Sequence, residues 1–173
     1  MLQDRRQFIA KTIFSGIGIA VGFSRSEALY ARESVLSPGS KWYEHAWRRA
    51  VIDMHIPDWD PKFLSEFDPD EYVDALVRSC AQSIVCYAQS HAGLFNYPTK
   101  VGKQHAGLRG RDIVAEMIEG CHKHGIAVVL YTSLIHDRWS FDTHPEWRMK
   151  SASGGDLRPN NRFGVVCPNS PYR

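Results

Sequence analysis

The sequence has little of three features that would narrow its function at once. Its most apolar early run, from Ile13 to Phe23, is shorter than the about 20 residues that a helix needs to cross a bilayer, so we expect no stable membrane anchor. Its 21 basic and 19 acidic residues nearly balance, and no basic run occurs, so we expect no nucleic-acid partner. With 43% hydrophobic and 23% charged residues, however, the composition is that of a folded globular protein.

Cysteine is scarce as well, and it is scattered along the chain. The four cysteines form no CxxC pair and have no histidines at zinc-finger spacing. They are Cys80, Cys86, Cys121 and Cys167. The first three lie within apolar helix or strand patterns, which predicts buried free thiols rather than metal ligands, although a disulfide in an oxidising compartment stays open. We expect no cofactor.

The first 31 residues have the layout of a secretory signal. Arg5 and Arg6 precede Phe8 and Ile9, and a weakly apolar run and several small residues follow. The arginine pair makes the segment similar to a twin-arginine signal peptide, which predicts export to the periplasm or the cell exterior by the twin-arginine translocation machinery. The alternative is a basic amphipathic N-terminus that stays attached. Since residues 1–31 carry four of the basic and two of the acidic residues, 17 of each sign remain in the mature chain.

After a polar linker at residues 32–40, short apolar segments without alternation recur along the chain. Such segments are typical of strands buried on both faces of a parallel sheet. They lie at residues 50–56, 83–88 and 126–132.

Two amphipathic helices separate the predicted strands. Asp68 is a good N-cap before Pro69, and the first of the two helices runs to Cys80. The second helix is predicted from Arg111 to His124, with Gly125 as its C-terminal stop. The resulting order of strands and helices predicts an α/β fold with parallel strands.

Long polar loops follow the strand ends, which favours a (β/α)8 TIM barrel over a doubly wound sheet. A complete barrel takes about 250 residues. We therefore expect residues 41–173 to form its N-terminal part, about three strand-helix units, as a fragment truncated before strand four. A complete small three-stranded domain is the alternative.

Polar and aromatic side chains follow each predicted strand end, where a barrel carries its functional face. Flat rings with fixed hydrogen-bonding groups suit a sugar, so we expect a carbohydrate substrate. The predicted substrate-binding residues are His55, His91, Tyr97, Lys100, His105 and Trp147. Asp53 and His55, two residues apart on a strand, are instead a possible metal pair in a metal-dependent hydrolase.

Several segments together resemble a known family. They are the run from Ser83 to Gly102, the helix-strand unit at residues 112–131, the segment at residues 144–147 and the closing segment at residues 166–172. Over residues 42–173 they are similar to the family called hypothetical glycosyl hydrolase 6, itself distantly similar to the α-L-fucosidases of glycoside hydrolase family 29. The resemblance implies a (β/α)8 fold that acts on glycosidic bonds, with His55, His91 and Tyr97 binding sugar hydroxyls.

Catalysis would need two carboxyl groups, about 5 Å apart in a retaining glycosidase and further apart in an inverting one. The resemblance places the nucleophile at the end of strand four, beyond this chain. Asp53 and Asp137 are the carboxylates placed nearest to the predicted site, but no catalytic residue is assigned. A non-catalytic carbohydrate-binding barrel remnant therefore stays as an alternative to a glycoside hydrolase.

Overall fold

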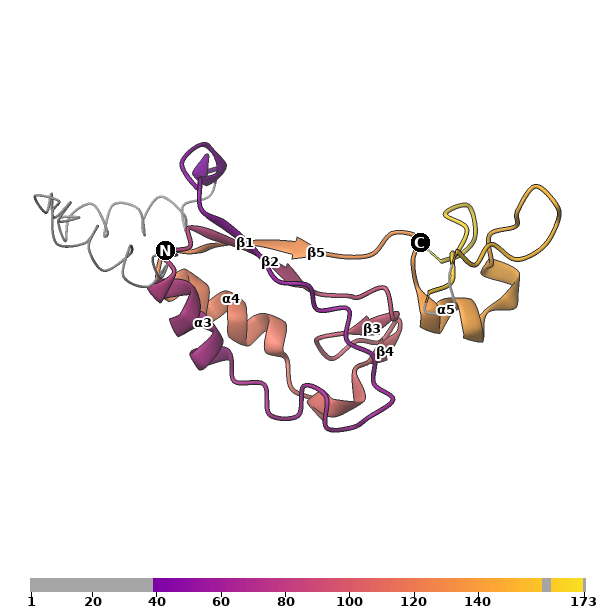
Figure 1. The fold of residues 1–173 in the computed structure, drawn as a ribbon, viewed down its shortest axis with the longest axis horizontal. Helices are drawn as coiled ribbons and strands as arrows, with labels where there is room; N and C mark the ends of the chain where they lie inside the picture. The colour runs from indigo at the N-terminus through magenta and orange to yellow at the C-terminus, as the bar shows by residue number, and fades with distance from the viewer. Residues whose placement is uncertain (1–38, 160–162, 173) are drawn as a thin grey trace, which may run out of the picture.

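The computed structural model describes residues 39–159 and 163–172, so the predicted signal and all but the last two residues of the predicted linker lie outside the described part. Three parallel strands organise the fold. They are β1 (Arg49–Val51), β2 (Ser83–Tyr87) and β5 (Ala127–Tyr131), in the sheet order β1-β2-β5 (Figure 1). The predicted α/β class with parallel strands is confirmed.

Two helices, α3 (Pro69–Arg78) and α4 (Ile113–Lys123), lie side by side against one face of this sheet (Figure 1). Each begins at an aspartate whose carboxylate accepts free backbone N–H groups of the first turn. Asp68 accepts from Asp70 and Glu71 at 2.9 and 3.2 Å, and Asp112 accepts from Ala115 at 2.8 Å. The predicted helix starts therefore follow from local capping chemistry.

The hydrophobic core lies between the sheet and these helices. Ile84 and Cys86 of β2 pack with Met117 and Cys121 of α4 in one buried cluster. Because successive side chains of a strand point to opposite faces, Tyr87 lies on the face away from Cys86, where its register partner in β5 is Tyr131. The strand ends thus present tyrosines on the face that the two helices leave open.

The first strand is shorter than predicted, ending at Val51 instead of Ile56. The carboxylate of Asp53 accepts the backbone N–H of His55 at 3.0 Å, which is the local bond of an Asx turn and bends the chain out of the extended conformation. As a result His55 leaves the sheet in a loop rather than on a strand.

The connections contain more structure than the sequence predicted. The loop after β2 includes two paired two-residue strands, β3 (Leu94–Phe95) and β4 (Lys103–Gln104), and the short 3-10 helix η2 (Ala106–Leu108). After β5 come α5 (Arg138–Thr143) and η3 (Pro145–Trp147). In Figure 1, α5 lies beyond the tips of the β2 and β5 arrows, that is, at the carboxyl ends of the strands. A further 3-10 turn, η1 (Trp42–Glu44), precedes the sheet.

The four cysteines are all free thiols. Cys86 and Cys121 are buried as predicted, and burial raises their pKa to about 12 and about 11. The prediction that Cys80 is buried was wrong, because this residue lies just past the end of α3 and not on its inner face. Within the described ranges, no helix combines the length and the hydropathy needed to cross a membrane.

Candidate functional site

Two of the predicted site residues, His55 and His91, meet at the carboxyl ends of the strands. Their rings stack with centroids 3.8 Å apart and planes inclined by 19°. The backbone N–H of His91 donates to Nδ1 of His55 at 3.0 Å. Because Nδ1 accepts this bond, the proton of a neutral His55 lies on Nε2, which is 3.7 Å from Oδ1 of Asp53.

The tyrosines at the ends of β2 and β5 complete this cluster. The hydroxyl of Tyr131 and Nε2 of His91 are hydrogen-bonded at 2.7 Å, and the rings of Tyr87 and Tyr131 are 4.4 Å apart. Burial raises the pKa of Tyr87, with Asp53 and Tyr131 adding to the shift, so this phenol stays protonated at neutral pH. Neither tyrosine was selected from the sequence, although each lies one residue before the end of its predicted strand and so close to the barrel's functional face.

A third histidine lies next to this pair. The ring of His136, which follows β5, is 4.9 Å from that of His91, and its Nδ1 is buried with no hydrogen-bond partner in the described part of the chain. The loops after all three parallel strands therefore each bring one histidine to the same place.

An open cleft of about 720 Å³ borders the histidine pair. Aromatic rings and polar groups line it together. The lining residues are Asp53, His55, Ile56, Pro57, Trp59, Phe63, Ala92, Arg138 and Phe163. Trp59 and Phe63 are in edge-to-face contact at 4.7 Å. Such a mixture of ring surfaces with a few fixed hydrogen-bonding groups fits a small polar ligand with an apolar face.

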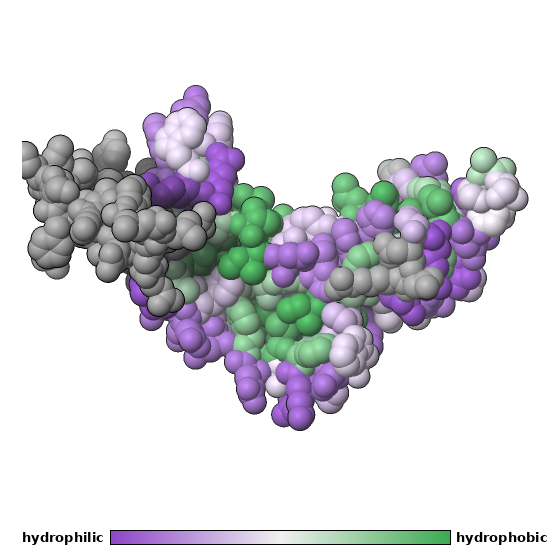
Figure 2. All heavy atoms as spheres, viewed as in Figure 1, coloured by the Kyte–Doolittle hydropathy of each residue, from purple (hydrophilic) through white to green (hydrophobic). Residues whose placement is uncertain are grey.

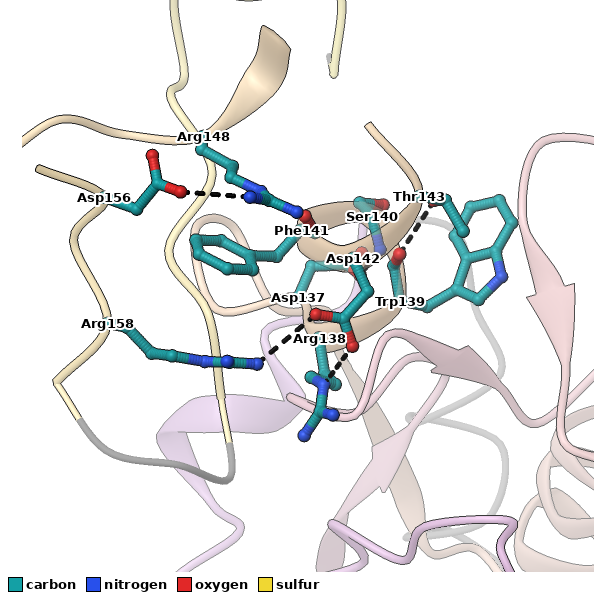
Figure 3. A network of polar contacts seen from close by, with 10 residues as sticks. All are labelled: Asp137, Arg138, Trp139, Ser140, Phe141, Asp142, Thr143, Arg148, Asp156 and Arg158. Carbon is teal, nitrogen blue, oxygen red and sulfur yellow. Dashed lines mark hydrogen bonds and ion pairs between the residues drawn. The ribbon is translucent and has the colours of Figure 1, made fainter. Parts of the chain in front are cut away.

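Arg138 adds a positive charge to this cleft, and no sequence pattern predicted it. Its Nε bonds to one carboxylate oxygen of Asp142, while Arg158 lies 3.3 Å from the other oxygen (Figure 3). Arg148 donates to the carbonyl of Phe141 at 2.7 Å. The network fixes α5 to the segment that follows it and thereby holds Arg138 at the cleft.

Three of the predicted site residues are placed elsewhere. Tyr97 packs against the hydrophobic core, and its ring centroid lies 5.4 Å from that of Phe95. Lys100 is exposed in the loop between β3 and β4. His105 is only 1% exposed: its Nδ1 accepts the N–H of Gly107 at 3.1 Å, and its Nε2 lies 3.1 Å from the carbonyl oxygen of Pro57. None of the three lines the cleft, and the bonds of His105 are those of a structural residue.

Trp147 belongs to a second cavity of about 730 Å³, which residues at the N-terminal end of α5 also line. Its ring stacks on His144 at 3.6 Å with the planes 13° apart. This cavity is also lined by Asp137, which lies apart from the cleft of His55. The structure thus separates Trp147 from the histidine pair.

The two candidate carboxylates differ sharply in environment. Asp53 is exposed and lines the cleft. Asp137 is buried and caps α5, and its two oxygens accept hydrogen bonds from backbone and side-chain donors. Burial raises the pKa of Asp137, and the bonds from Ser140, Tyr172 and Gln89 oppose that shift. Neither environment identifies a nucleophile.

A metal site needs several ligands around one point, and three or more is usual for a protein-held ion. Within residues 39–159 and 163–172, no group of three or more His, Cys, Asp or Glu side chains is placed to hold one. Asp53 and His55 therefore remain a pair, and one of the two ring nitrogens of His55 is already used by the N–H of His91.

Three parallel strands with helices on one face and a ligand-sized cleft at their carboxyl ends have the architecture of part of a (β/α)8 barrel. The chain belongs to the hypothetical glycosyl hydrolase 6 family, whose sequence model matches residues 68–173. No curated protein sequence matches the chain.

A solved structure agrees on the fold. The chain is similar to α-L-fucosidase isoenzyme 2 from Paenibacillus thiaminolyticus, with a TM-score of 0.65 and 23% identity over 73% of this chain and 20% of that one. It therefore spans about a fifth of the length of that fucosidase.

Two further likenesses have TM-scores below 0.5 and so do not establish a shared fold. One is a hypothetical protein from Ruminiclostridium thermocellum, with 21% identity over 58% of this chain and 54% of that one and a TM-score of 0.45. The other is the Thermotoga maritima α-fucosidase in complex with fucose, with 20% identity over 44% and 19% of the two chains and a TM-score of 0.38.

Proposed function

We propose that residues 41–173 form the sugar-binding part of an exported, α-L-fucosidase-like glycoside hydrolase, in which His55 and His91 bind hydroxyl groups of the substrate. One observation carries the proposal. The two imidazoles stack at the carboxyl ends of neighbouring parallel strands, beside a cleft with aromatic walls. Membership of a glycosyl hydrolase family and the fucosidase-like fold support the same reading.

The chemistry of the pair suits a polyol. Imidazole nitrogens donate or accept hydrogen bonds according to their tautomer, and the bond from the N–H of His91 to Nδ1 of His55 places the proton of the neutral His55 ring on Nε2. The rings of Trp59 and Phe63 offer apolar surface for the C–H face of a sugar. The proposal assigns sugar binding to this chain and leaves the nucleophile unassigned.

Binding of L-fucose to the full chain, followed by ligand-observed NMR, tests this assignment. Replacing His91 with alanine should weaken binding by about tenfold or more, since it removes one hydrogen-bonding ring and the surface on which the other stacks. His45→Ala is the matched control, because His45 is an exposed histidine outside the cleft. Fucose binding that persists unchanged in His91→Ala would remove the proposal.

A second candidate, carbohydrate binding without catalysis, is favoured by the environment of Asp137, whose carboxylate is occupied by protein donors. A chromogenic α-L-fucoside separates the two when it is given to a chain that includes the strand-four region, where the resemblance places the nucleophile. Release of the chromophore by a protein that binds fucose supports the hydrolase, whereas binding without release supports the binding module.

We also propose that residues 1–31 are a twin-arginine signal peptide and residues 32–40 a linker, so that the mature protein acts in the periplasm or outside the cell. The arginine pair ahead of Phe8 and Ile9 supports this. Replacing Arg5 and Arg6 with lysine should leave the protein in the cytoplasmic fraction. Equal export of this variant and of the natural sequence would contradict the proposal.

A further inference from the structure

A buried carboxylate lies beneath the turn that carries His91. Asp137 is 1% exposed, and its Oδ1 accepts the backbone N–H of Ser140 at 2.7 Å, which caps α5. Its Oδ2 accepts from Nε2 of Gln89 at 2.8 Å and from the hydroxyl of Tyr172 at 3.1 Å. One side chain therefore joins the end of β2, the start of α5 and the C-terminal segment.

The capped N-terminal end of α5 also binds the peptide groups of the turn that carries His91. The first N–H groups of a helix have no partner within the helix. Here the N–H of Arg138 donates to the carbonyl oxygen of His91 at 3.0 Å, and that of Trp139 donates to the carbonyl oxygen of Ala92 at 3.2 Å. The position of His91 is thus set by where α5 begins.

Gly93 shows how closely the turn that carries His91 approaches the start of α5. A Cβ atom on this residue would lie 2.1 Å from Oδ1 of Asp137 and 2.7 Å from the backbone nitrogen of Trp139. Its φ of 76° is also in the left-handed region that glycine adopts without strain. No side chain fits between the turn and the helix cap, so Asp137 is in direct contact with the backbone that follows His91.

We propose that Asp137 is a positioning residue for the histidine pair: by capping α5 and binding Gln89, it holds His91 where its ring stacks on His55 and its Nε2 meets Tyr131. The positioning role rests on the proposed function in one respect, namely that His55 and His91 bind sugar. Asp137 touches neither ring, and it lines the second cavity and not the cleft of His55. It therefore acts through the backbone of the turn.

The side-chain NMR signals of His91 in the full chain, recorded without any sugar, test this role. Stacking on His55 gives a ring-current shift, and the bond to Tyr131 favours one tautomer. Asp137→Ala should abolish the ring-current shift and mix the tautomers. Asp137→Asn should restore both in part, because its amide oxygen can still accept the N–H of Ser140 while its NH2 group cannot accept the bond from Gln89.

Asp112→Ala is the matched control. Asp112 caps α4 by accepting the N–H of Ala115 at 2.8 Å, so its replacement removes a helix cap of the same kind. It has no contact with the turn of His91, and the His91 signals should stay as in the natural sequence. Unchanged His91 signals in Asp137→Ala, or an equal change in Asp112→Ala, would overturn the proposal.

Gln89→Leu decides the question if Asp137→Ala does not fold. It leaves the bond from Ser140 that caps α5 in place, and it removes the hydrogen bond from Gln89 to Asp137 together with the side-chain contact of Gln89 with the Tyr172 hydroxyl. A partial loss of the ring-current shift is expected, and an unchanged shift would refute the role of Asp137. A separate titration of the natural chain with L-fucose tests the proposed function, so the two can fail independently.

Discussion

The imidazole of His105 is held between two backbone groups. Because Nδ1 accepts the N–H of Gly107, the proton of the neutral ring lies on Nε2 and is donated to the carbonyl of Pro57. Burial lowers the pKa of His105 from 6.5, and the bond to Pro57 and the charge of Asp58 oppose that shift only in part. A proton added to Nδ1 would face the N–H of Gly107 and break the turn.

The unfolded chain therefore binds more protons at this position than the folded protein does. The stability that the neutral ring contributes is present above the unfolded pKa of 6.5 and is lost as the pH falls below it. His105→Gln should lower the free energy of unfolding by about 1–2 kcal/mol near neutral pH, since one of the two bonds is lost. It should also flatten the pH dependence between about pH 7 and pH 5.

Urea denaturation at several pH values measures both effects. His45→Gln serves as the control, because that histidine is exposed and should leave the pH dependence as it is in the natural sequence. A His105→Gln protein that loses stability on acidification as steeply as the natural chain would contradict the assigned role.

At the scale of elements, α3 and α4 end in the same way. In each, the first two backbone N–H groups beyond the C-cap donate back to carbonyls of the last turn at 2.9–3.1 Å, which is the Schellman arrangement. The residue after the cap must then adopt a left-handed conformation. In α4 this residue is Gly125, with φ 68°, but in α3 it is Cys80, with φ 55°. Only glycine takes this conformation without strain.

Replacing Cys80 with glycine should therefore raise the free energy of unfolding by about 0.5–1 kcal/mol, although glycine also adds freedom to the unfolded chain. Gly125→Ala should lower it by about 1 kcal/mol, because it creates the strain that Cys80 already bears. Thermal or urea unfolding gives both values. Cys80→Ala separates strain from the loss of the thiol: it should be near neutral, and an effect equal to that of Cys80→Gly would argue against strain.

Local signals explain which elements the sequence predicts. The caps at Asp68 and Asp112 and the unbroken apolar runs of β2 and β5 are contained in the segments themselves, and the structure confirms them. The two-residue strands β3 and β4 are too short to show any period, and they exist because the loop folds back on itself. The six residues of α5 are likewise fixed by contacts with the turn after β2.

The same difference between local signals and tertiary contacts explains which residues of the candidate site the sequence predicts. A residue a few positions past the end of a strand still lies near the strand-end face, which is why His55 and His91 could be selected from the sequence. Farther along a loop, the chain direction depends on tertiary contacts. His105 therefore turns inward, and Arg138, which no sequence pattern marks, reaches the cleft.

At the scale of the whole molecule, the sheet leaves apolar surface in contact with water. The outer edge of β5 has no strand partner within the described residues, and large hydrophobic side chains follow it. Val129, Leu130, Leu134 and Ile135 are 38–76% exposed, and Figure 2 shows hydrophobic residues at the surface near the middle of the molecule. Parallel sheets are normally covered on both faces, and open strand edges recruit other strands.

This chain should therefore self-associate with rising concentration and bind a hydrophobic dye. Sedimentation velocity and dye fluorescence measure the two effects. Replacing Leu130 and Leu134 with lysine should reduce both without lowering the free energy of unfolding, because neither side chain is buried. Val77→Lys, a similar change on the outer side of α3, should leave association unchanged, since charge there does not touch the strand edge. A monomer at all concentrations that binds no dye would show that the edge is protected by some other means.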